Sequence, residues 1–561
     1  MQLQSQDRIC SPRYPSTADK EGIWISSVED TSGTRVVGFG GTLDICCCAP
    51  TRTHRGFFGG IARMFSTFTF GIEMIVCFVL LDFLLGLRWI MAAAGVVLVV
   101  IATMLPKKDA AGEKQGGYGK VVVFKESLVR QLLRPMEVVA MIKCKFGAIG
   151  TSRSGLAYGL ESLELNEDDV AFCSEKLKQV SRSFATVITF LPNRVDSPLR
   201  LAVAVFYLVL RALDTVEDDM DLNRFDECVL KEDKTDVADA RLVAKQRLLR
   251  TFAKRLEDSI NGDCKQKRLV GFGEGNEKEL LDNIDQLVNV MGKLPKKLQV
   301  VILSITQEMG EGMADYIARD LKNGTDDEVD FEKYCHVAAG TVGDGLTRLF
   351  AVAGYCPSSL VLRNDLWDSM GSFLQRTNII RDYLEDLVDG RAWWPRSCWS
   401  KFVPKSDSRP ESLAMLAEIS SIENGQSVRC LNQMICDALV LVPKCIEYLE
   451  ALDEPSVISF CALPQVMAIA TLAECYANEK VFRGVVKIRK GLAAKIMLDL
   501  APINGKTTAS IRASYLGSFK EFITIIQQKS DHCSDEKVYQ LCGKLSKQIT
   551  ARQEARQTTR D

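Results

Sequence analysis

Apolar residues recur at three- and four-residue spacing along most of this chain from about residue 131 onward. This period is typical of amphipathic helices, whereas the alternating pattern of strands is scarce. The best-defined predicted helices cover 171–187, 199–215, 298–319, 331–353, 364–387 and 464–477. The pattern therefore predicts an all-α fold built as a single large helical domain.

Shifts in residue composition divide the chain into segments. Residues 1–64 are rich in Ser, Thr, Gly and Arg and lack periodicity, which is typical of a poorly ordered extension. We expect an N-terminal extension at 1–64, a transmembrane segment or hairpin at 65–106, a Gly- and Lys-rich linker at 107–130, the helical domain at 131–505 and a C-terminal helical or flexible tail at 506–561. The tail is charged after about Ser546 and is expected to fray there.

The stretch 68–105 is the most apolar part of the chain. One membrane span needs about 20 apolar residues, so the stretch is long enough for one tilted helix or for a hairpin broken near Gly86. Cations lie on both sides of it, at Arg52, Arg55, Arg63, Lys107, Lys108 and Lys114. They favour a hairpin with both ends in the cytosol, but Glu73 and Asp82 would then each cost roughly 3 kcal/mol in the first span. Membrane association is the preferred interpretation, and a buried helix of a soluble domain is the alternative.

Charge and cysteine content exclude some classes of function. The formal net charge of the 561 residues is −2, which gives no general electrostatic basis for binding nucleic acid. The nineteen cysteines are scattered, and with only three histidines they form no pattern at zinc-binding spacing. Reduced thiols buried in cytosolic helices are expected rather than a disulfide framework.

Two acidic clusters carry the clearest chemical signal. Asp214, Glu217 and Asp218 end one predicted helix, and Asp382 and Asp386 lie near the end of another. Residues four apart share a helix face, so each aspartate pair would repel and destabilise an isolated helix. A divalent cation removes that repulsion, and Mg²⁺ often binds one or two carboxylates together with substrate phosphates. Two such faces across a cavity would hold a Mg²⁺–diphosphate group.

The alternative interpretation is a pair of solvated acidic faces. The apolar run 201–210 before the first cluster argues against it. Arg211 and Arg381 accompany the two clusters and offer bidentate donors to phosphate oxygens. Ordinary Arg–Asp ion pairs of small energetic consequence are the other possibility for these arginines.

A short segment on another predicted helix also fits a diphosphate. Ser181, Arg182 and Ser183 offer one cation and two hydroxyls, followed by Phe184. Alone this tetrapeptide is a weak signal, because an arginine on a helix surface is common.

Six segments in order give the chain its resemblance to a known family. They are VSRSFA at 180–185, FYLVLRALDTVEDDM at 206–220, KYCHVAAG at 333–340, NIIRDYLED at 378–386, SFCALPQVMAIATLA at 459–473 and VFRGVVKIRKG at 481–491. Together they resemble the squalene synthases (farnesyl-diphosphate farnesyltransferases) of the squalene/phytoene synthase family, over roughly residues 131–500.

The resemblance implies an isoprenoid synthase fold around a central cavity, with an N-terminal membrane-associated extension here. It implies head-to-head condensation of two farnesyl diphosphates to presqualene diphosphate with Mg²⁺, then NADPH-dependent rearrangement to squalene, the first committed step of sterol synthesis. It further implies a monomeric catalytic domain at the endoplasmic reticulum membrane that faces the cytosol.

The resemblance also assigns residue roles. Tyr334 matches the tyrosine of the first half-reaction, and Lys487 and Arg489 match positions implicated in binding NADPH phosphate. No GxGxxG fingerprint follows a strand, so the nicotinamide site would lie in the helical domain. A phenol ionises near pH 10, so Tyr334 would need nearby cations or the departing diphosphate to act as a base. A structural, hydrogen-bonded tyrosine is the alternative.

A carbocation must be kept from water, so the cavity behind the charged mouth should be apolar and aromatic. The candidates for this wall are Phe184, Phe206, Tyr207 and Phe460, each of which could instead be plain core.

The chain departs from the family pattern in two places. The family anchor is a hydrophobic helix after the catalytic domain, whereas here the apolar stretch precedes it. Asp344 places an acid where an apolar residue is expected. Two rival functions also stay open: a non-reductive synthase that ends at presqualene diphosphate, dehydrosqualene or a phytoene-type product, and a catalytically silent membrane scaffold.

Overall fold

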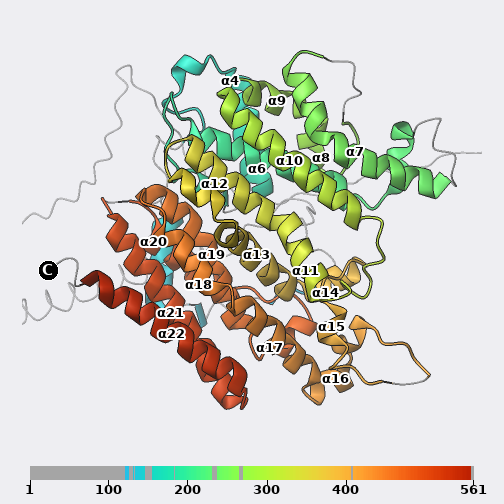
Figure 1. Ribbon diagram of the computed structural model, residues 1–561, viewed down its shortest axis with the longest axis vertical. Coiled ribbons are helices and arrows are strands. Elements are labelled where there is room, and N and C mark those ends of the chain that lie inside the picture. The colour runs from blue at the N-terminus through green and yellow to red at the C-terminus, as the bar shows by residue number, and fades with distance from the viewer. Residues whose placement is uncertain are drawn as a thin grey trace, which may run out of the picture. The chain divides into compact units, whose positions relative to one another are not determined.

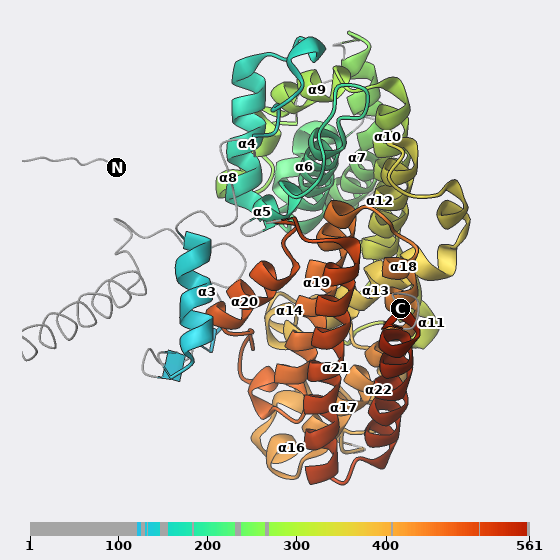
Figure 2. The same cartoon turned by 90° about the vertical axis from the view of Figure 1, so that its left-hand side faces the viewer.

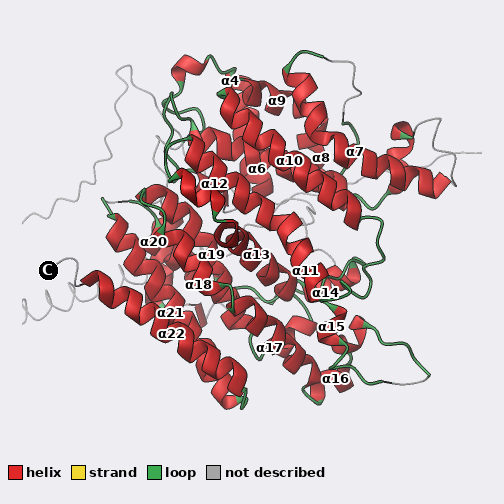
Figure 3. Ribbon diagram, in the orientation of Figure 1, coloured by secondary structure: helices red, strands yellow, loops and turns green. Residues whose placement is uncertain are grey.

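The computed structural model describes residues 121–124, 130–131, 133–145, 155–181, 184–229, 237–263, 269–405, 408–503 and 505–557. The predicted extension at 1–64 and the apolar stretch at 65–106 lie outside these residues, as do Arg182 and Ser183. The described part is helical throughout (Figures 1 and 3) and contains two isolated β-bridges. The prediction of an all-α fold is confirmed.

The α-helices are α3 (Pro135–Lys145), α4 (Glu167–Ser181), α5 (Phe184–Ile188), α6 (Leu199–Asp218), α7 (Val237–Ile260), α8 (Gly275–Asp282), α9 (Ile284–Gly292), α10 (Lys296–Tyr316), α11 (Glu328–Cys335), α12 (Thr341–Val352), α13 (Asn364–Arg381), α14 (Tyr383–Val388), α15 (Arg396–Trp399), α16 (Ile419–Glu423), α17 (Gln426–Leu439), α18 (Val442–Glu450), α19 (Pro455–Cys475), α20 (Lys490–Leu500), α21 (Thr508–His532) and α22 (Glu536–Gln557). A π-helical turn, His336–Gly340, joins α11 to α12. Short 3₁₀ turns occupy Glu161–Leu163, Leu222–Cys228, Ser358–Leu362, Leu413–Ala417 and Glu479–Phe482.

Helix α19 lies near the middle of the helical body (Figure 1). It packs on α13, α18, α20 and α21. Among the described residues it is the helix long and apolar enough to cross a membrane, but 83% of its most apolar window is buried inside the fold. An apolar helix that is buried on all sides is typical of a protein core. Pro464 lies within it, and the neighbouring Gln465 donates from Nε2 to the carbonyl oxygen of Met370 at 2.9 Å.

Helix α6 carries the first acidic cluster into the fold. It contains no internal Gly or Pro, and its residues from Leu199 to Leu213 are almost all buried. Its acidic end is held by Asp219, whose Oδ2 accepts from Arg224 at 2.9 Å and from the backbone N–H of Gly273 at 2.8 Å. Apolar packing therefore holds the helix in place, and the hydrogen bonds of Asp219 hold the end that carries the carboxylates.

The structure differs from the sequence prediction in two places, a break within one predicted helix and the end of the C-terminal tail. The helix predicted over 364–387 breaks at Asp382, between α13 and α14. The amide of Asp386 still donates to the carbonyl oxygen of Asp382 at 3.0 Å, so the two acids keep helical spacing across the break. The tail expected to fray after Ser546 is instead helical to Gln557, because α22 packs along α21.

Candidate active site

The acidic end of α6 is bound by an arginine that comes from a distant part of the chain. Nη1 of Arg391 lies 2.7 Å from Oε1 of Glu217, and Nη2 lies 2.5 Å from Oδ1 of Asp218. Arg391 follows α14, which carries the second acidic cluster. Its backbone N–H donates to the carbonyl oxygen of Asp386 at 3.0 Å, so Arg391 links the first cluster to the segment that carries the second.

The carboxylates of α6 are crowded and removed from water. Burial raises the pKa of Asp214 to about 7, with Arg211 opposing the rise and Asp218 adding to it. Burial raises the pKa of Glu217 to about 8, although Arg391 and Lys245 lower it. The existing cations thus fall short of the negative charge that these carboxylates would carry when all are ionised.

Lys245 of α7 binds the backbone at the C-terminal end of α6, beside this cluster. Its buried Nζ donates to the carbonyl oxygens of Glu217 at 2.6 Å and Asp219 at 2.9 Å. A cation at a helix C-terminus satisfies carbonyls that have no partner within the helix and interacts favourably with the helix dipole. Lys245 therefore positions the acidic end of α6 through its backbone.

The second acidic cluster surrounds the break between α13 and α14. Arg381 donates to both carboxylate oxygens of Asp382, from Nε at 2.8 Å and from Nη2. Burial and the neighbouring Asp382 raise the pKa of Asp386 well above its usual range, while Arg391 opposes the rise. Burial also raises the pKa of Glu385 to about 7, and the charge of Lys487 acts against that rise. The second cluster is thus also short of positive charge.

Tyr334 lies within electrostatic reach of both clusters. Burial raises the pKa of its phenol well above the usual value, and the carboxylates of Glu217 and Asp386 raise it further, while Arg391 lowers it. The ring stacks on Trp393 with centroids 3.5 Å apart and contacts Tyr316 edge-on at 5.2 Å. The structure therefore brings the predicted tyrosine and the two predicted acidic clusters into one site.

The two predicted arginines have different surroundings. Arg381 donates two hydrogen bonds to the carboxylate of Asp382. Nη2 of Arg211 lies 3.1 Å from Oε1 of Glu277 on α8, and the charge of Asp214 also acts on it. Nε of Arg211 is buried and has no hydrogen-bond partner among the described residues. Arg211 therefore presents an unsatisfied donor beside the first cluster.

Three of the four predicted aromatic wall residues contact one another. The ring of Phe184 lies 5.6 Å from that of Tyr207 and 5.6 Å from that of Phe460, both tilted. Phe206 is buried against Gly345, where an added Cβ would lie 2.6 Å from the Phe206 ring. Ser181 is buried at the end of α4, and its hydroxyl donates to the carbonyl oxygen of Leu177 at 2.5 Å. Phe206 and Tyr207 thus lie about two to three helical turns before the acidic end of α6.

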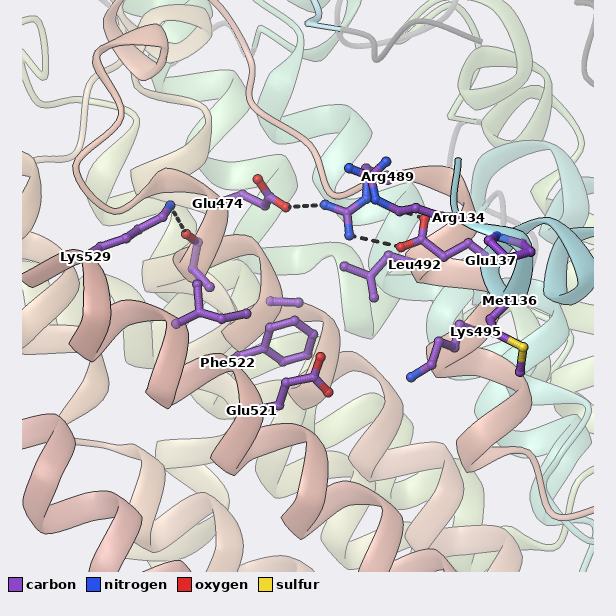
Figure 4. A pocket seen from close by; sticks show the side chains of 14 residues that line it. Arg134, Met136, Glu137, Glu474, Arg489, Leu492, Lys495, Glu521, Phe522 and Lys529 are labelled. Atoms are coloured by element: carbon purple, nitrogen blue, oxygen red, sulfur yellow. Dashed lines mark hydrogen bonds and ion pairs between the residues drawn. The ribbon is translucent and has the colours of Figure 1, made fainter. Parts of the chain in front are cut away.

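The predicted cofactor residues occupy an extended segment that precedes α20. Arg489 donates from Nη2 to Oε1 of Glu137 at 3.0 Å and from Nη1 to Oε1 of Glu474 at 2.9 Å. Figure 4 shows this double ion pair at one side of a cavity of about 510 Å³. Lys487 is exposed and acts electrostatically on Glu385. These two residues therefore face different parts of the surface, one toward α3 and one toward the second acidic cluster.

The donor set suits Mg²⁺ held jointly with a substrate. Within the described residues, no three acidic, histidine or cysteine side chains converge closely enough to enclose an ion on their own. Mg²⁺ commonly binds through one or two carboxylates plus substrate phosphates, which suits two separate acidic edges. Burial raises the pKa of Asp214, Glu217 and Asp386, and a divalent cation beside these carboxylates would favour their charged forms.

Sequence reasoning missed four residues of this site: Arg391, Trp393, Lys245 and Glu277. Arg391 follows Gly390 in a turn, and its distance of five residues from Asp386 matches no helical spacing. The others come from separate segments with no shared motif.

Asp344, the acid that the family pattern did not lead us to expect, forms an ion pair with Arg348 one turn later in α12, at 3.2 Å.

Comparison with known proteins adds a family to this geometry. The squalene/phytoene synthase family model matches residues 177–491. The squalene synthase of Candida albicans is 41% identical over 373 residues, which cover 65% of this chain and 73% of that protein. The rat squalene synthase is 41% identical over 331 residues, which cover 58% of this chain and 68% of the rat protein. A solved complex of TcSQS with the ligand BPH1237 is 34% identical with a TM-score of 0.57, covering 69% of this chain and 99% of that one.

The chain belongs to the squalene/phytoene synthase family. Within that family it is similar to squalene synthases of fungi, animals and plants, and the resemblance seen in the sequence is confirmed.

Proposed function

We propose that this protein is a squalene synthase that condenses two farnesyl diphosphates and then reduces the product with NADPH. The observation that carries the proposal is the meeting of the two acidic clusters, Arg391 and Tyr334 in one site. Sequence identity of about 40% to squalene synthases supports the same activity.

The first half-reaction needs a leaving diphosphate and a protected cation. The C–O bond of one substrate breaks with its electron pair on the diphosphate, where negative charge grows. The residues that would hold Mg²⁺ are Asp214, Glu217, Asp218, Asp382 and Asp386, and the ion would supply Lewis-acid stabilisation of that charge. We assign Arg211 and Arg381, which lie beside the two clusters, as donors to the same oxygens.

The allylic cation then reacts with the double bond of the second substrate. New C–C bonds close a cyclopropane ring when a proton leaves, which gives presqualene diphosphate. The aromatic wall of Phe184, Tyr207 and Phe460 keeps water from the cation. Each aromatic face also stabilises positive charge.

Tyr334 serves as a neutral hydrogen-bonding group at the proton that leaves. Its raised pKa keeps the phenol protonated before substrate binds. The phenol oxygen can accept a proton only as it passes its own to a stronger base, and the departed diphosphate is that base. Arg391 stabilises the negative charge of this exchange, because it already opposes the rise in the phenol pKa.

The second half-reaction requires a hydride donor. We assign the phosphates of NADPH to Lys487 and Arg489, whose cationic side chains suit that role. NADPH held there would supply the hydride that the cation needs once the second diphosphate has left. Arg489 must then exchange at least one carboxylate, Glu137 or Glu474, for phosphate.

A non-reductive synthase is the second candidate function, and the same ion pairs favour it. Arg489 is neutralised by two carboxylates, so its affinity for a cofactor phosphate is reduced. Such an enzyme would end at presqualene diphosphate or at dehydrosqualene.

We assign the protein to the endoplasmic reticulum membrane with its catalytic domain in the cytosol, as a monomer. The apolar stretch 68–105 supports this assignment. Squalene is very apolar, so a membrane beside the site would receive the product.

The identity of the lipid product separates the candidates. The full chain in detergent is incubated with farnesyl diphosphate and Mg²⁺, with and without NADPH. Squalene that forms only with NADPH supports squalene synthase. Presqualene diphosphate or dehydrosqualene as the final product in both samples supports the non-reductive enzyme, and absence of turnover by folded protein supports the scaffold.

A further inference from the structure

The outer side of α3 and of the residues just before it carries a row of exposed apolar side chains. Leu133, Met136 and Val139 are 76%, 71% and 43% exposed and follow one another at three-residue spacing. Residues three apart on a helix lie on one side of it. Single exposed apolar residues are ordinary, but a contiguous row marks an interaction surface.

The opposite side of α3 is fixed to the rest of the fold by α20. Glu137, Val138 and Ala140 are buried there. The fit is close, because a Cβ added at Gly491 of α20 would lie 2.6 Å from Cβ of Glu137. Figure 2 shows α3 beside α20 at the flank of the helical body. The inner side of α3 therefore holds the helix in place and leaves the apolar row facing outward.

The charges around the row are positive. The described residues of this segment include Arg130, Arg134, Lys143 and Lys145. The acid of α3, Glu137, faces inward to Arg489. Lys495 of α20 lines the same cavity as Met136 (Figure 4). Three carboxylates also line that cavity, those of Glu137, Glu474 and Glu521.

We propose that this apolar row with its flanking cations, here called the α3 face, docks on a bilayer that contains anionic phospholipid. Apolar side chains of an interfacial helix enter the boundary between headgroups and acyl chains, and Lys and Arg contact the phosphates. The α3 face shares no residue with the acidic site, and its proposed role rests on the membrane assignment made above for the apolar stretch 68–105.

The position of α3 in the chain supports a membrane as the occupant. Residues 106–120 separate the apolar stretch 68–105 from the first described residue, and fully extended they span at most roughly 50 Å. A bilayer that holds the apolar stretch therefore lies within reach of α3. A second copy of the chain fits less well, since a two-fold contact would set these cations against themselves.

Photo-crosslinking in vesicles tests the proposal. A benzophenone amino acid replaces Met136 in the full chain, and for the control it replaces Val300, which is 52% exposed on α10. Both variants are reconstituted into vesicles of phosphatidylcholine with phosphatidylserine, and flotation establishes that each is bound. We expect lipid adducts at position 136 and few at position 300. The charge reversals Lys143→Glu and Lys145→Glu should together lower the yield at 136 roughly tenfold or more.

Equal lipid yields at the two positions, or adducts at 136 that contain only protein, overturn the proposal, as does failure of the chain to float. Presqualene diphosphate formation, which does not involve the proposed cofactor residues, is measured separately in detergent on the same variants. It should equal that of the parent, so that a failure of docking and a failure of the proposed condensation are distinguished.

Discussion

Nη1 of Arg391 lies 2.7 Å from Oε1 of Glu217, which joins the segment after α14 to the acidic end of α6. These residues are 174 positions apart in the sequence. The contact links the chain segment that follows the second acidic cluster to the first cluster. In the proposed reaction, this guanidinium would lie where the charge of the diphosphate develops.

Replacement of Arg391 should therefore damage catalysis more than folding. We expect Arg391→Ala to lower kcat by about 10²–10³-fold, a loss typical of removing one donor to a developing anion. Arg391→Lys should recover only part of that loss, because an ammonium cannot bridge two carboxylates as a planar guanidinium does. Arg396→Ala, at a 58% exposed arginine of α15, is the matched control and should retain activity. Parent-like turnover in Arg391→Ala would remove this residue from the site.

Tyr334→Phe removes one hydroxyl and keeps the ring stacked on Trp393. We expect presqualene diphosphate formation to fall by about 10²-fold or more, as for loss of a proton-transfer group. The Tm should change little, because the aromatic stack is preserved. Unchanged turnover with a lowered Tm would instead identify Tyr334 as a structural residue.

The pKa of Asp214 predicts how stability depends on pH. Its value of about 7 in the fold exceeds the usual 3.8, so the folded chain binds more protons than the unfolded chain across that interval. The free energy of unfolding that this group contributes is therefore unaffected below the unfolded pKa, decreases as pH rises toward 7, and stays low above it.

Asp214→Asn should consequently raise the Tm of the Mg²⁺-free protein by about 2 °C or more near pH 8, and by less near pH 5. Adding Mg²⁺ with inorganic diphosphate should stabilise the parent and not the variant, because metal ligands must be deprotonated. Differential scanning calorimetry measures both effects. A Tm difference that is independent of pH would contradict the assigned pKa.

Glu137→Gln tests the cofactor assignment of Arg489. It removes one of two carboxylates from the guanidinium, so the KM for NADPH should fall a few-fold while the rate of presqualene diphosphate formation stays constant. Glu474→Gln removes the other carboxylate, which lies on a different helix, from Arg489 and should have the same effect. Arg489→Ala should raise the KM for NADPH without affecting condensation. A KM that none of these variants changes would place the cofactor elsewhere.

The spacing of the acids could be predicted from the sequence because it is local. Asp214 and Asp218 lie four apart on an uninterrupted apolar helix, and their shared face follows from helix geometry. The same rule gave the helical spacing of Asp382 and Asp386 but not the break at Asp382, which no Gly or Pro marks.

The rest of the site depends on contacts between distant segments. Glu137 lies 352 residues from its partner Arg489, and no local pattern relates the two. Trp393 and Arg391 follow a turn whose course is set by packing against α6 and α11 rather than by their own spacing. The sequence alone therefore predicted the acidic and aromatic residues of the candidate site, but not the residues elsewhere in the chain that pair with their charges.

The central claim is that the two acidic clusters act as one diphosphate site. The most direct measurement is release of diphosphate from farnesyl diphosphate by the full chain with Mg²⁺, for Asp214→Asn, Asp382→Asn and the double variant. Asp365→Asn, an acid in the first turn of α13, serves as the control. The account predicts that each single variant loses most turnover and that the double variant loses little more, because residues that act as a unit are not additive. Full activity in either single variant, or losses that multiply in the double variant, would contradict it.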